Sequence, residues 1–376
     1  MRFLFWLSLF GAAYSYFLYP LVLLALPSRK VAPHAEPGSW PDVSIIVTAH
    51  NEANRIEEKL RNTLALDYPR ERMEIIVASD ASTDATDDIV RRYETQRVRL
   101  VRAEERKGKE YAQWHAVNAA RGEILVFSDV ATTIPEGAIR QLVERFRDPQ
   151  VGAVSSVDRF VSEDGEVIGE GAYVKYEMWL RKLESSVNSL VGLSGSFFAA
   201  RKSICDDWHI SVPSDFNTAL NCVRQRRLAV SDPAVIGVYK NIADTSKEYQ
   251  RKLRTVIRGI AAVAVRPDVL NPFKFGLFAF QVWSHKIMRW LVPWFLILLF
   301  GASAVLAPQH WIYAVALAGQ IAFYGLALLG FLVPAMRAKT VVKLPFFFTQ
   351  VNVAIAHATV AFAFGKRVTV WSPSKR

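Results

Sequence analysis

Uncharged hydrophobic runs lie near both ends of the chain, and shorter ones lie between them. Residues 3–26 carry no charged side chain, and as a helix this run is long enough to span about 30 Å of hydrocarbon. A cleaved signal peptide usually has a shorter apolar core and a small-residue cleavage site, and neither feature is clear here. The pattern therefore predicts an uncleaved transmembrane anchor.

Three more apolar segments lie near the C-terminus. The runs at residues 290–306 and 311–334 predict two further membrane spans. The segment at residues 344–364 is weaker because four polar side chains interrupt it, so it is expected to lie at the membrane interface rather than to cross. These polar residues are Gln350, Asn352, His357 and Thr359.

Between the apolar ends, buried-strand patterns alternate with helical ones, after a Pro- and Gly-rich linker at residues 31–41. Such alternation predicts an α/β domain of the Rossmann-like kind, in which a mostly parallel sheet is joined by helical crossovers. Ligands of these sheets bind at the carboxyl ends of the strands. The predicted strands are residues 43–47, 74–78, 98–101 and 124–128, and the predicted helices are residues 52–64, 83–94 and 109–120.

The net charge of +11 lies entirely beside the apolar segments. Residues 1–30 hold 3 basic side chains and residues 287–376 hold 8, with no acidic residue in either segment, so residues 31–286 are formally neutral. This distribution argues against a nucleic-acid-binding domain and matches the positive-inside bias of membrane proteins. Because Arg29 and Lys30 outweigh Arg2 across the first span, the α/β domain is expected to be cytoplasmic, at the cell (inner) membrane.

The two cysteines, Cys205 and Cys222, form no metal-ligand pattern. In a reducing compartment they are expected to be thiols that contribute to packing.

Polar residues follow the predicted strands at the edge where ligands bind. Asp80 follows the second strand and Asp129 ends the fourth. No Gly-rich phosphate loop follows the first strand, which argues against a dinucleotide enzyme or a P-loop ATPase. A base-binding carboxylate at Asp80 and a metal-binding one at Asp129 would suit a nucleotide diphosphate held with one divalent ion. For each Asp taken alone, a turn or a helix cap is the alternative.

An ordered set of motifs around these residues resembles the family 2 glycosyltransferases with a GT-A fold. It is similar to the processive, membrane-bound synthases of cellulose, hyaluronan or poly-N-acetylglucosamine. The motifs are VSIIVTAHNE at residues 43–52, ASDASTDAT at 78–86, KGK at 107–109, SD at 128–129, GEGAYVKYE at 169–177, GLSGSFFAAR at 192–201, PSDF at 213–216 and the basic helix at 247–259.

The resemblance covers nearly the whole chain and implies a domain organisation. The implied parts are a transmembrane anchor at residues 1–30, a GT-A glycosyltransferase domain at 31–262, interfacial helices at 263–289, and a C-terminal transmembrane region with a basic tail at 290–376.

The resemblance also implies a donor site. Thr48, His50 and Glu52 would line the nucleotide, and Asp80 would accept a hydrogen bond from the uracil of a UDP-sugar.

Further along the chain, Lys107 and Lys109 would lie near this donor. Asp129 matches the first acid of the family's Asp-x-Asp motif, which reaches the diphosphate through Mg²⁺ or Mn²⁺, but Ala131 replaces the second acid. One carboxylate with phosphates and water can hold Mg²⁺, so this departure bears on the tightness of metal binding.

Asp215 matches the catalytic base of the family. An inverting transfer needs one carboxylate to take the proton of the acceptor hydroxyl, while cations neutralise the leaving diphosphate. The alternative for Asp215 is the N-cap of a helix at residues 216–226. The turn that contains Ser194 and Gly195 would bring backbone close to the acceptor sugar, although a plain tight turn would have the same sequence.

Arg251, Arg254 and Arg258 share one face of the basic helix. The family usually has Gln-x-x-Arg-Trp here, and this chain has no Trp in register. The arginines would contact the donor phosphates or, alternatively, anionic membrane lipid.

Together these features predict a membrane-bound inverting glycosyltransferase that transfers a sugar from a nucleotide-sugar, with UDP-sugar favoured, to a growing polysaccharide. Polar residues of the 344–364 segment would line the glycan path, with a homo-oligomer or an export partner widening it. The alternatives are single transfer to a lipid-linked acceptor, or an inactive membrane scaffold, which the loss of the second acid at Ala131 would favour.

Overall fold

The structure of the chain, a computed structural model, describes residues 1–29, 40–161, 172–240 and 245–368. Most of the predicted linker, the start of the 169–177 motif and the end of the basic tail lie outside these residues. The chain separates into two compact units, and the domain limits predicted at residues 30, 262 and 289 stay predictions. The membrane unit comprises Met1–Ala25, Asp244–Ile260 and Phe280–Arg367, and the sheet unit comprises Leu26–Ala243, Ala261–Ala279 and Val368–Arg376.

Within the described residues, the sheet unit is built on a mixed sheet of eight strands in the order β3-β2-β1-β4-β7-β6-β8-β5. Neighbours among β1 to β4 are parallel, β7 runs antiparallel to β4 and β6, and β6 and β8 are parallel. The strands are β1 Val43–Ala49, β2 Met73–Ser79, β3 Val98–Arg102, β4 Ile124–Asp129, β5 Thr132–Thr133, β6 Val151–Val161, β7 Phe197–Arg201 and β8 Leu228–Lys240.

Strands β1, β2 and β4 are almost fully buried because helices cover both faces of the sheet. All seven residues of β1 are buried, and alternate side chains enter different cores. Ile45 packs with Leu60 on one face, and Ile46 packs with Ala116 on the other. The helices of the sheet unit include α3 Ile56–Leu64, α4 Thr86–Arg91, α5 Lys109–Ala119, α6 Ala138–Glu144, α7 Ala172–Val187, α8 Ser214–Arg224, α10 Pro272–Phe275 and the start of α11 Leu277–Val282.

Cys205 and Cys222 are buried in the core that contains Ile46. Both are free thiols, and burial raises the pKa of each. They contribute to packing, as the sequence predicts.

The described residues contain four helical segments that are long and apolar enough to cross a membrane. Each coincides with a predicted apolar segment, and the fourth begins at Thr340 instead of residue 344. The segments are Arg2–Ala25, which holds α1 Arg2–Ala13 and α2 Tyr19–Ala25; Leu277–Gln309, which holds α11 and α12 Met288–Leu306; α13 Trp311–Leu332; and α14 Thr340–Ala363.

Within the membrane unit, α1 packs closely on α12. A Cβ at Gly11 would lie 2.5 Å from the ring of Phe295, so this approach requires glycine. The segments Arg2–Ala25 and Leu277–Gln309 each contain a π-helical turn, which is Tyr14–Leu18 (η1) in the first and Trp283–Ile287 (η7) in the second. A hydrogen bond of 2.9 Å between Tyr14 Oη and Ser284 Oγ joins these two turns.

Candidate active site

The carboxyl ends of β1, β2 and β4 lie side by side and bring the predicted donor residues together. Thr48 is paired with Ala78 of β2 and with Asp129 of β4 across the ladders. Thr48 is buried, and its hydroxyl accepts a hydrogen bond from Gln113 Nε2 at 3.1 Å. This edge of the sheet is where an α/β fold places its ligands.

The loop after β1 is tied to the loop after β2. His50 Nδ1 lies 2.7 Å from the carbonyl oxygen of Asp80. Glu52 is buried and accepts a hydrogen bond of 2.8 Å from Arg55 Nε, yet burial still raises the pKa of its carboxyl. Asn51 adopts a left-handed φ of 52°, which lets its side chain accept from the backbone N–H of Thr83 at 2.8 Å.

Asp80 organises the loop that precedes α5. Its carboxylate is buried and accepts hydrogen bonds from the backbone N–H groups of Lys107 and Gly108, each at 3.0 Å. The Lys107 side chain pairs with Glu105. The structure thus shows Asp80 in a loop-holding role, and its contact with a nucleotide base stays a prediction.

Lys109 connects β4 to the turn that precedes β7. Its Nζ donates to Asp129 Oδ1 at 2.5 Å and to the carbonyl oxygen of Gly195 at 2.6 Å. The same turn is also bonded to β4 through the N–H of Asp129 and the carbonyl oxygen of Ser196, at 3.0 Å. Two residues predicted from separate motifs, Lys109 and Asp129, therefore form one ion pair.

Asp215 lies next to the turn that carries Gly195. A Cβ built at Gly195 would be 3.2 Å from Asp215 Oδ2, so the turn approaches the carboxylate closely. Asp215 is the second residue of α8, the helix cap position is Pro213, and no side-chain cap bond is formed. The helix-cap alternative for Asp215 is therefore not the arrangement in the structure.

The residues around Asp129 fit a divalent ion that is shared with a ligand. Among the residues that the structure describes, no group of three His, Cys, Asp or Glu side chains could hold a metal, in keeping with Ala131. The Asp129 side chain is 22% exposed, which leaves room for another partner beside Lys109. One carboxylate together with phosphate oxygens and water satisfies Mg²⁺, whereas a site made only by the protein would need more ligands.

Lys59 lies at the candidate site, although no sequence motif pointed to it. It is buried under the turn after β4, where its Nζ donates to Ser128 Oγ at 2.8 Å and to the carbonyl oxygen of Thr132 at 2.6 Å. It lies on the same side of α3 as Ile56 and Leu60. A lysine within this apolar stripe is the signal that could have revealed it.

We expect Lys59 to make folding stability depend on pH. Burial lowers the pKa of its amine from 10.5 to about 7. Between these values the unfolded chain binds more protons at Lys59, so the free energy of unfolding should rise with pH, by roughly 1 kcal/mol per unit. The unfolding temperature should increase more between pH 6.5 and pH 9 for the wild type than for Lys59→Met. Equal gains would contradict this role of Lys59.

Ser194 is held by a carboxylate that was also not predicted. Ser194 Oγ donates to Asp158 Oδ1 at 2.7 Å, and the backbone N–H of Ser194 donates to Ser155 Oγ at 2.7 Å. Arg181 donates to the same Ser155 oxygen at 2.6 Å. Burial raises the pKa of Asp158. This network fixes the turn that carries Gly195, and a single Asp on a strand gave no sequence signal for it.

The three arginines of the basic helix lie on α9 Thr245–Val265. Arg251 is exposed, whereas Arg254 and Arg258 are half-buried. They belong to the membrane unit, and their contact with donor phosphates stays a prediction.

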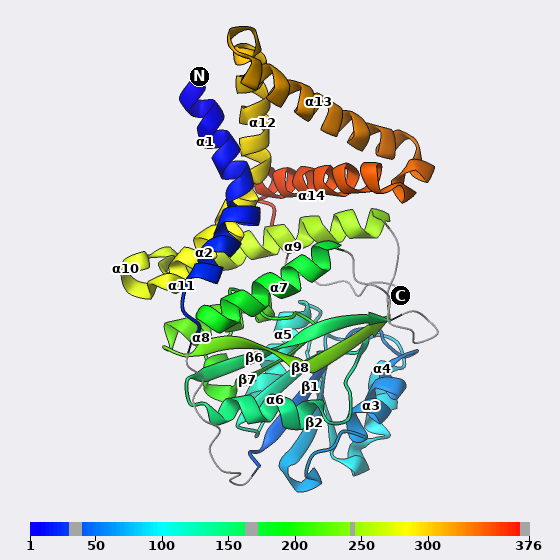
Figure 1. Cartoon of the computed structure of the whole chain (residues 1–376). Helices are drawn as coiled ribbons and strands as arrows, with labels where there is room; N and C mark the ends of the chain where they lie inside the picture. Colours follow the sequence, from blue (N-terminus) through cyan, green and yellow to red (C-terminus); the bar gives the residue numbers. More distant parts are fainter. Residues whose placement is uncertain (30–39, 162–171, 241–244, 369–376) are drawn as a thin grey trace. The chain divides into compact units, whose positions relative to one another are not determined.

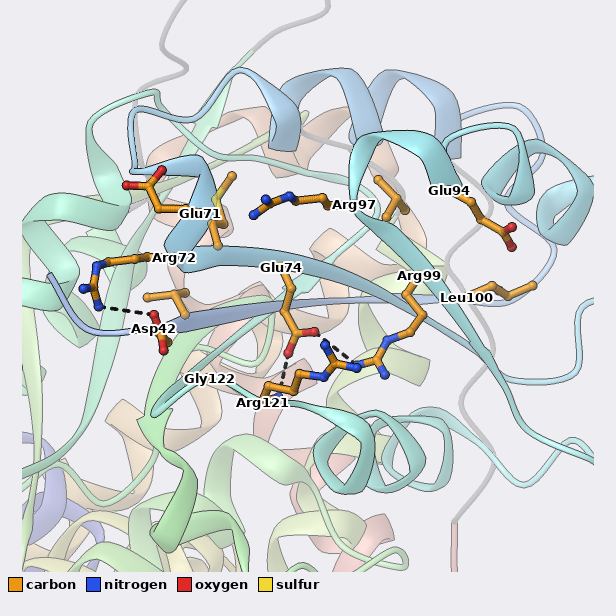
Figure 2. A pocket seen from close by; sticks show the side chains of 13 residues that line it. Asp42, Glu71, Arg72, Glu74, Glu94, Arg97, Arg99, Leu100, Arg121 and Gly122 are labelled. Atoms are coloured by element: carbon orange, nitrogen blue, oxygen red, sulfur yellow. Dashed lines mark hydrogen bonds and ion pairs between the residues drawn. The ribbon is translucent and has the colours of Figure 1, made fainter.

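A cavity of about 690 Å³ opens at the amino ends of β1 to β3, the opposite edge of the sheet from Asp129 (Figure 2). Its charged residues are balanced in number, and two ion pairs join four of them: Arg99 contacts Glu74 at 3.2 Å and Arg72 contacts Asp42 at 3.4 Å. This cavity is therefore separate from the candidate active site. Its charged lining residues are Asp42, Glu71, Arg72, Glu74, Glu94, Arg97, Arg99 and Arg121.

The fold belongs to a class with solved members. The chain superposes on the mannosyltransferase PcManGT from Pyrobaculum calidifontis, solved in complex with GDP-Man and Mn²⁺, with a TM-score of 0.71 and 26% identity over 95% of this chain and 96% of that one. The predicted GT-A glycosyltransferase fold with apolar helices is confirmed.

Part of the sequence matches a family model and known relatives. Residues 44–208 match the family model described as glycosyl transferase family 2, so the chain carries a family 2 glycosyltransferase domain, as predicted. Glycosyltransferase AglD of Haloferax volcanii is 34% identical over 128 residues, which cover 33% of this chain and 20% of AglD. The poly-beta-1,6-N-acetyl-D-glucosamine synthase of Staphylococcus epidermidis is 25% identical over 170 residues, which cover 44% of this chain and 40% of the synthase. The chain thus spans less than half the length of these two relatives.

Proposed function

We propose that the chain is a membrane-bound inverting glycosyltransferase that uses a nucleoside diphosphate sugar. The observation that supports this most directly is the cluster of Asp129, Lys109, Gly195 and Asp215 at the carboxyl edge of the sheet. It combines a carboxylate that would bind the metal ion, a fixed cation and a half-buried carboxylate, which are the groups that an inverting transfer requires.

In this proposal each residue has a chemical task. Asp215 takes the proton from the acceptor hydroxyl as that oxygen attacks the anomeric carbon, and Lys109 donates to the leaving diphosphate. Asp129 would hold Mg²⁺ or Mn²⁺, which would supply Lewis-acid stabilisation of the diphosphate. The Mn²⁺ in the PcManGT structure supports a divalent ion without choosing between the two metals.

The donor is a UDP-sugar or a GDP-sugar. The resemblance to polysaccharide synthases favours the UDP-sugar, and the GDP-Man bound to PcManGT favours the GDP-sugar. We therefore propose an assay with the full-length purified chain, Mn²⁺ or Mg²⁺, and a panel of both donor types, with release of UDP or GDP as the readout. We expect release with at least one donor. Absence of release with every donor would refute the proposed activity and favour the inactive scaffold.

The acceptor distinguishes two versions of the function. Similarity to the poly-N-acetylglucosamine synthase supports extension of a polysaccharide. The alternative is a single transfer, for which a lipid-linked acceptor is our candidate. The size of a radiolabelled product separates them. A label confined to a short lipid that solvent extracts would exclude the polymerase, and with it the need for a homo-oligomer or an export partner.

We further propose that the glycosyltransferase domain faces the cytoplasm at the cell (inner) membrane, with α14 at the membrane interface. Tyr249 Oη of α9 and His357 Nδ1 of α14 are 3.1 Å apart, so these two helices of the membrane unit are in contact (Figure 1). Since α9 carries three arginines, it is expected at the membrane surface facing anionic lipid, and this contact supports the same level for α14.

This topology predicts the side on which the basic tail lies. With three crossing segments and an interfacial α14, the C-terminus should be cytoplasmic, as the positive-inside bias favours. A green fluorescent protein fused after Arg376 should therefore fluoresce, and alkaline phosphatase fused there should be inactive. As an internal comparison, alkaline phosphatase fused after Leu332 or Ala338, before α14, should be inactive. If that fusion is inactive and the fusion after Arg376 is active, α14 crosses the membrane.

A further inference from the structure

The ammonium group of Lys109 occupies a fixed position at the carboxylate of Asp129. Besides its bonds of 2.5 Å to Asp129 Oδ1 and 2.6 Å to the Gly195 carbonyl oxygen, its side chain is only 9% exposed. Lys109 begins α5, and the loop before it is held by Asp80 through the N–H groups of Lys107 and Gly108. The amine is therefore positioned from both ends, by the backbone at its base and by two oxygen atoms at its tip.

This arrangement makes the surroundings of Asp129 unfavourable for a free divalent ion. Ala131 provides no second negative charge. The positive charge of Lys109 neutralises the negative charge of the Asp129 carboxylate. Lys59 adds a second amine close by, which donates to residues on either side of Asp129. The nearby carboxylate of Glu52 is itself paired with Arg55. A dication near Asp129 would meet the Lys109 ammonium at short range, where like charges repel strongly.

A nucleoside diphosphate would reverse this balance. Its phosphate oxygens carry several negative charges and accept hydrogen bonds from ammonium groups more readily than a carbonyl oxygen does. The Lys109 ammonium needs only to replace its hydrogen bond to Asp129 with one to a phosphate oxygen. The Asp129 carboxylate would then be available to the metal ion, and the negative charge of the diphosphate would balance both the ammonium and the metal ion.

We propose that Lys109 makes binding of the divalent ion depend on binding of the nucleotide diphosphate. The inference rests on the proposed function, because it requires that the site bind a nucleoside diphosphate. Coupling of this kind is reciprocal, so the metal ion increases the affinity for the nucleotide by the same factor. Lys109 thus acts on the metal through Asp129, in addition to its contact with the donor.

The test measures Mn²⁺ binding, not turnover. Free Mn²⁺ is followed by electron paramagnetic resonance during titration of the full-length protein, alone and with saturating UDP or GDP. We expect the wild type to bind Mn²⁺ at least about tenfold more tightly with the nucleotide than without it, within the usual range of coupling between sites. Lys109→Gln should bind Mn²⁺ about tenfold more tightly than the wild type without nucleotide, and should lose most of the coupling.

Three further variants separate charge from structure. Lys109→Arg keeps the positive charge and should retain the coupling. Lys274→Gln removes an exposed lysine that pairs with Asp268 and has no proposed role at the site, and should bind Mn²⁺ like the wild type. Ala131→Asp adds the second carboxylate while Lys109 stays in place, so it should tighten Mn²⁺ binding without nucleotide even if Lys109→Gln fails to fold.

The outcomes are distinguishable. The proposal is overturned if the wild-type affinity for Mn²⁺ is the same with and without a bound nucleotide, or if a folded Lys109→Gln binds Mn²⁺ alone no more tightly than the wild type. If Lys109→Gln does not fold, the first comparison decides. If a separate thermal-shift titration shows that neither UDP nor GDP binds, the proposed function fails. The comparison of Lys109→Gln with wild type in Mn²⁺ alone still decides whether Lys109 opposes the metal ion.

Discussion

Replacement of Asp215 by asparagine is expected to reduce sugar transfer by about 10²- to 10⁴-fold, the range usual for loss of a general base. The asparagine side chain has nearly the same size, so α8 and the close approach of Gly195 should persist. What it lacks is the capacity to take the proton of the acceptor hydroxyl. Donor affinity, measured by nucleotide titration, should change little because the proposed role of Asp215 concerns the acceptor.

A matched control for this change is Asp206→Asn, an exposed carboxylate on the segment just before α8. This variant should transfer sugar at the wild-type rate. If Asp215 served only the helix terminus, its replacement would lower stability by about 1 kcal/mol or less and leave the rate constant of transfer intact. Wild-type turnover by Asp215→Asn would refute the assignment of the base.

The second large effect is expected for Asp129→Asn. Turnover should fall by about 10²- to 10³-fold, comparable to the loss of one strong electrostatic contact to a developing anion. Two changes contribute: the metal ion loses its charged protein ligand, and Lys109 loses the carboxylate that positions it. Because the protein ligand itself is missing, raising the Mn²⁺ concentration should restore little of the activity, and tight Mn²⁺ binding with UDP or GDP should be lost.

Asp88→Asn provides the comparison, since Asp88 is an exposed carboxylate that pairs with Arg91 on α4. It should behave as wild type in both turnover and Mn²⁺ binding. Retention of metal-stimulated turnover in Asp129→Asn would mean that another group holds the ion, and that Asp129 was wrongly matched to the family motif.

The sequence predicted the frame of the molecule closely. The first and fourth predicted strands, residues 43–47 and 124–128, are observed as Val43–Ala49 and Ile124–Asp129. Continuous apolar runs between polar strand ends identify buried parallel strands from local composition alone. The apolar helices were found for the same reason, since length and absence of charge are local properties.

The sequence could place chemical groups at the sheet edge, but not their contacts. Asp80 was expected to face a nucleotide base, and its carboxylate bonds to the backbone of a loop 27 residues further on. Lys59 was not singled out from the sequence, and it lies buried under the turn after β4. Both arrangements depend on chain segments that meet only when the sheet is assembled.

By itself, the sequence determined the order of strands and helices up to β4, the apolar segments, the charge distribution and the identity of the acidic residues at the strand ends, because each of these follows from local composition and spacing. Only the tertiary structure decided that Lys109 is bound to Asp129, that Gly195 approaches Asp215, and that Asp158 holds Ser194. Hydrogen bonds and ion pairs act over about 3 Å, and residues far apart in the chain come within that distance only through the packing of the whole sheet.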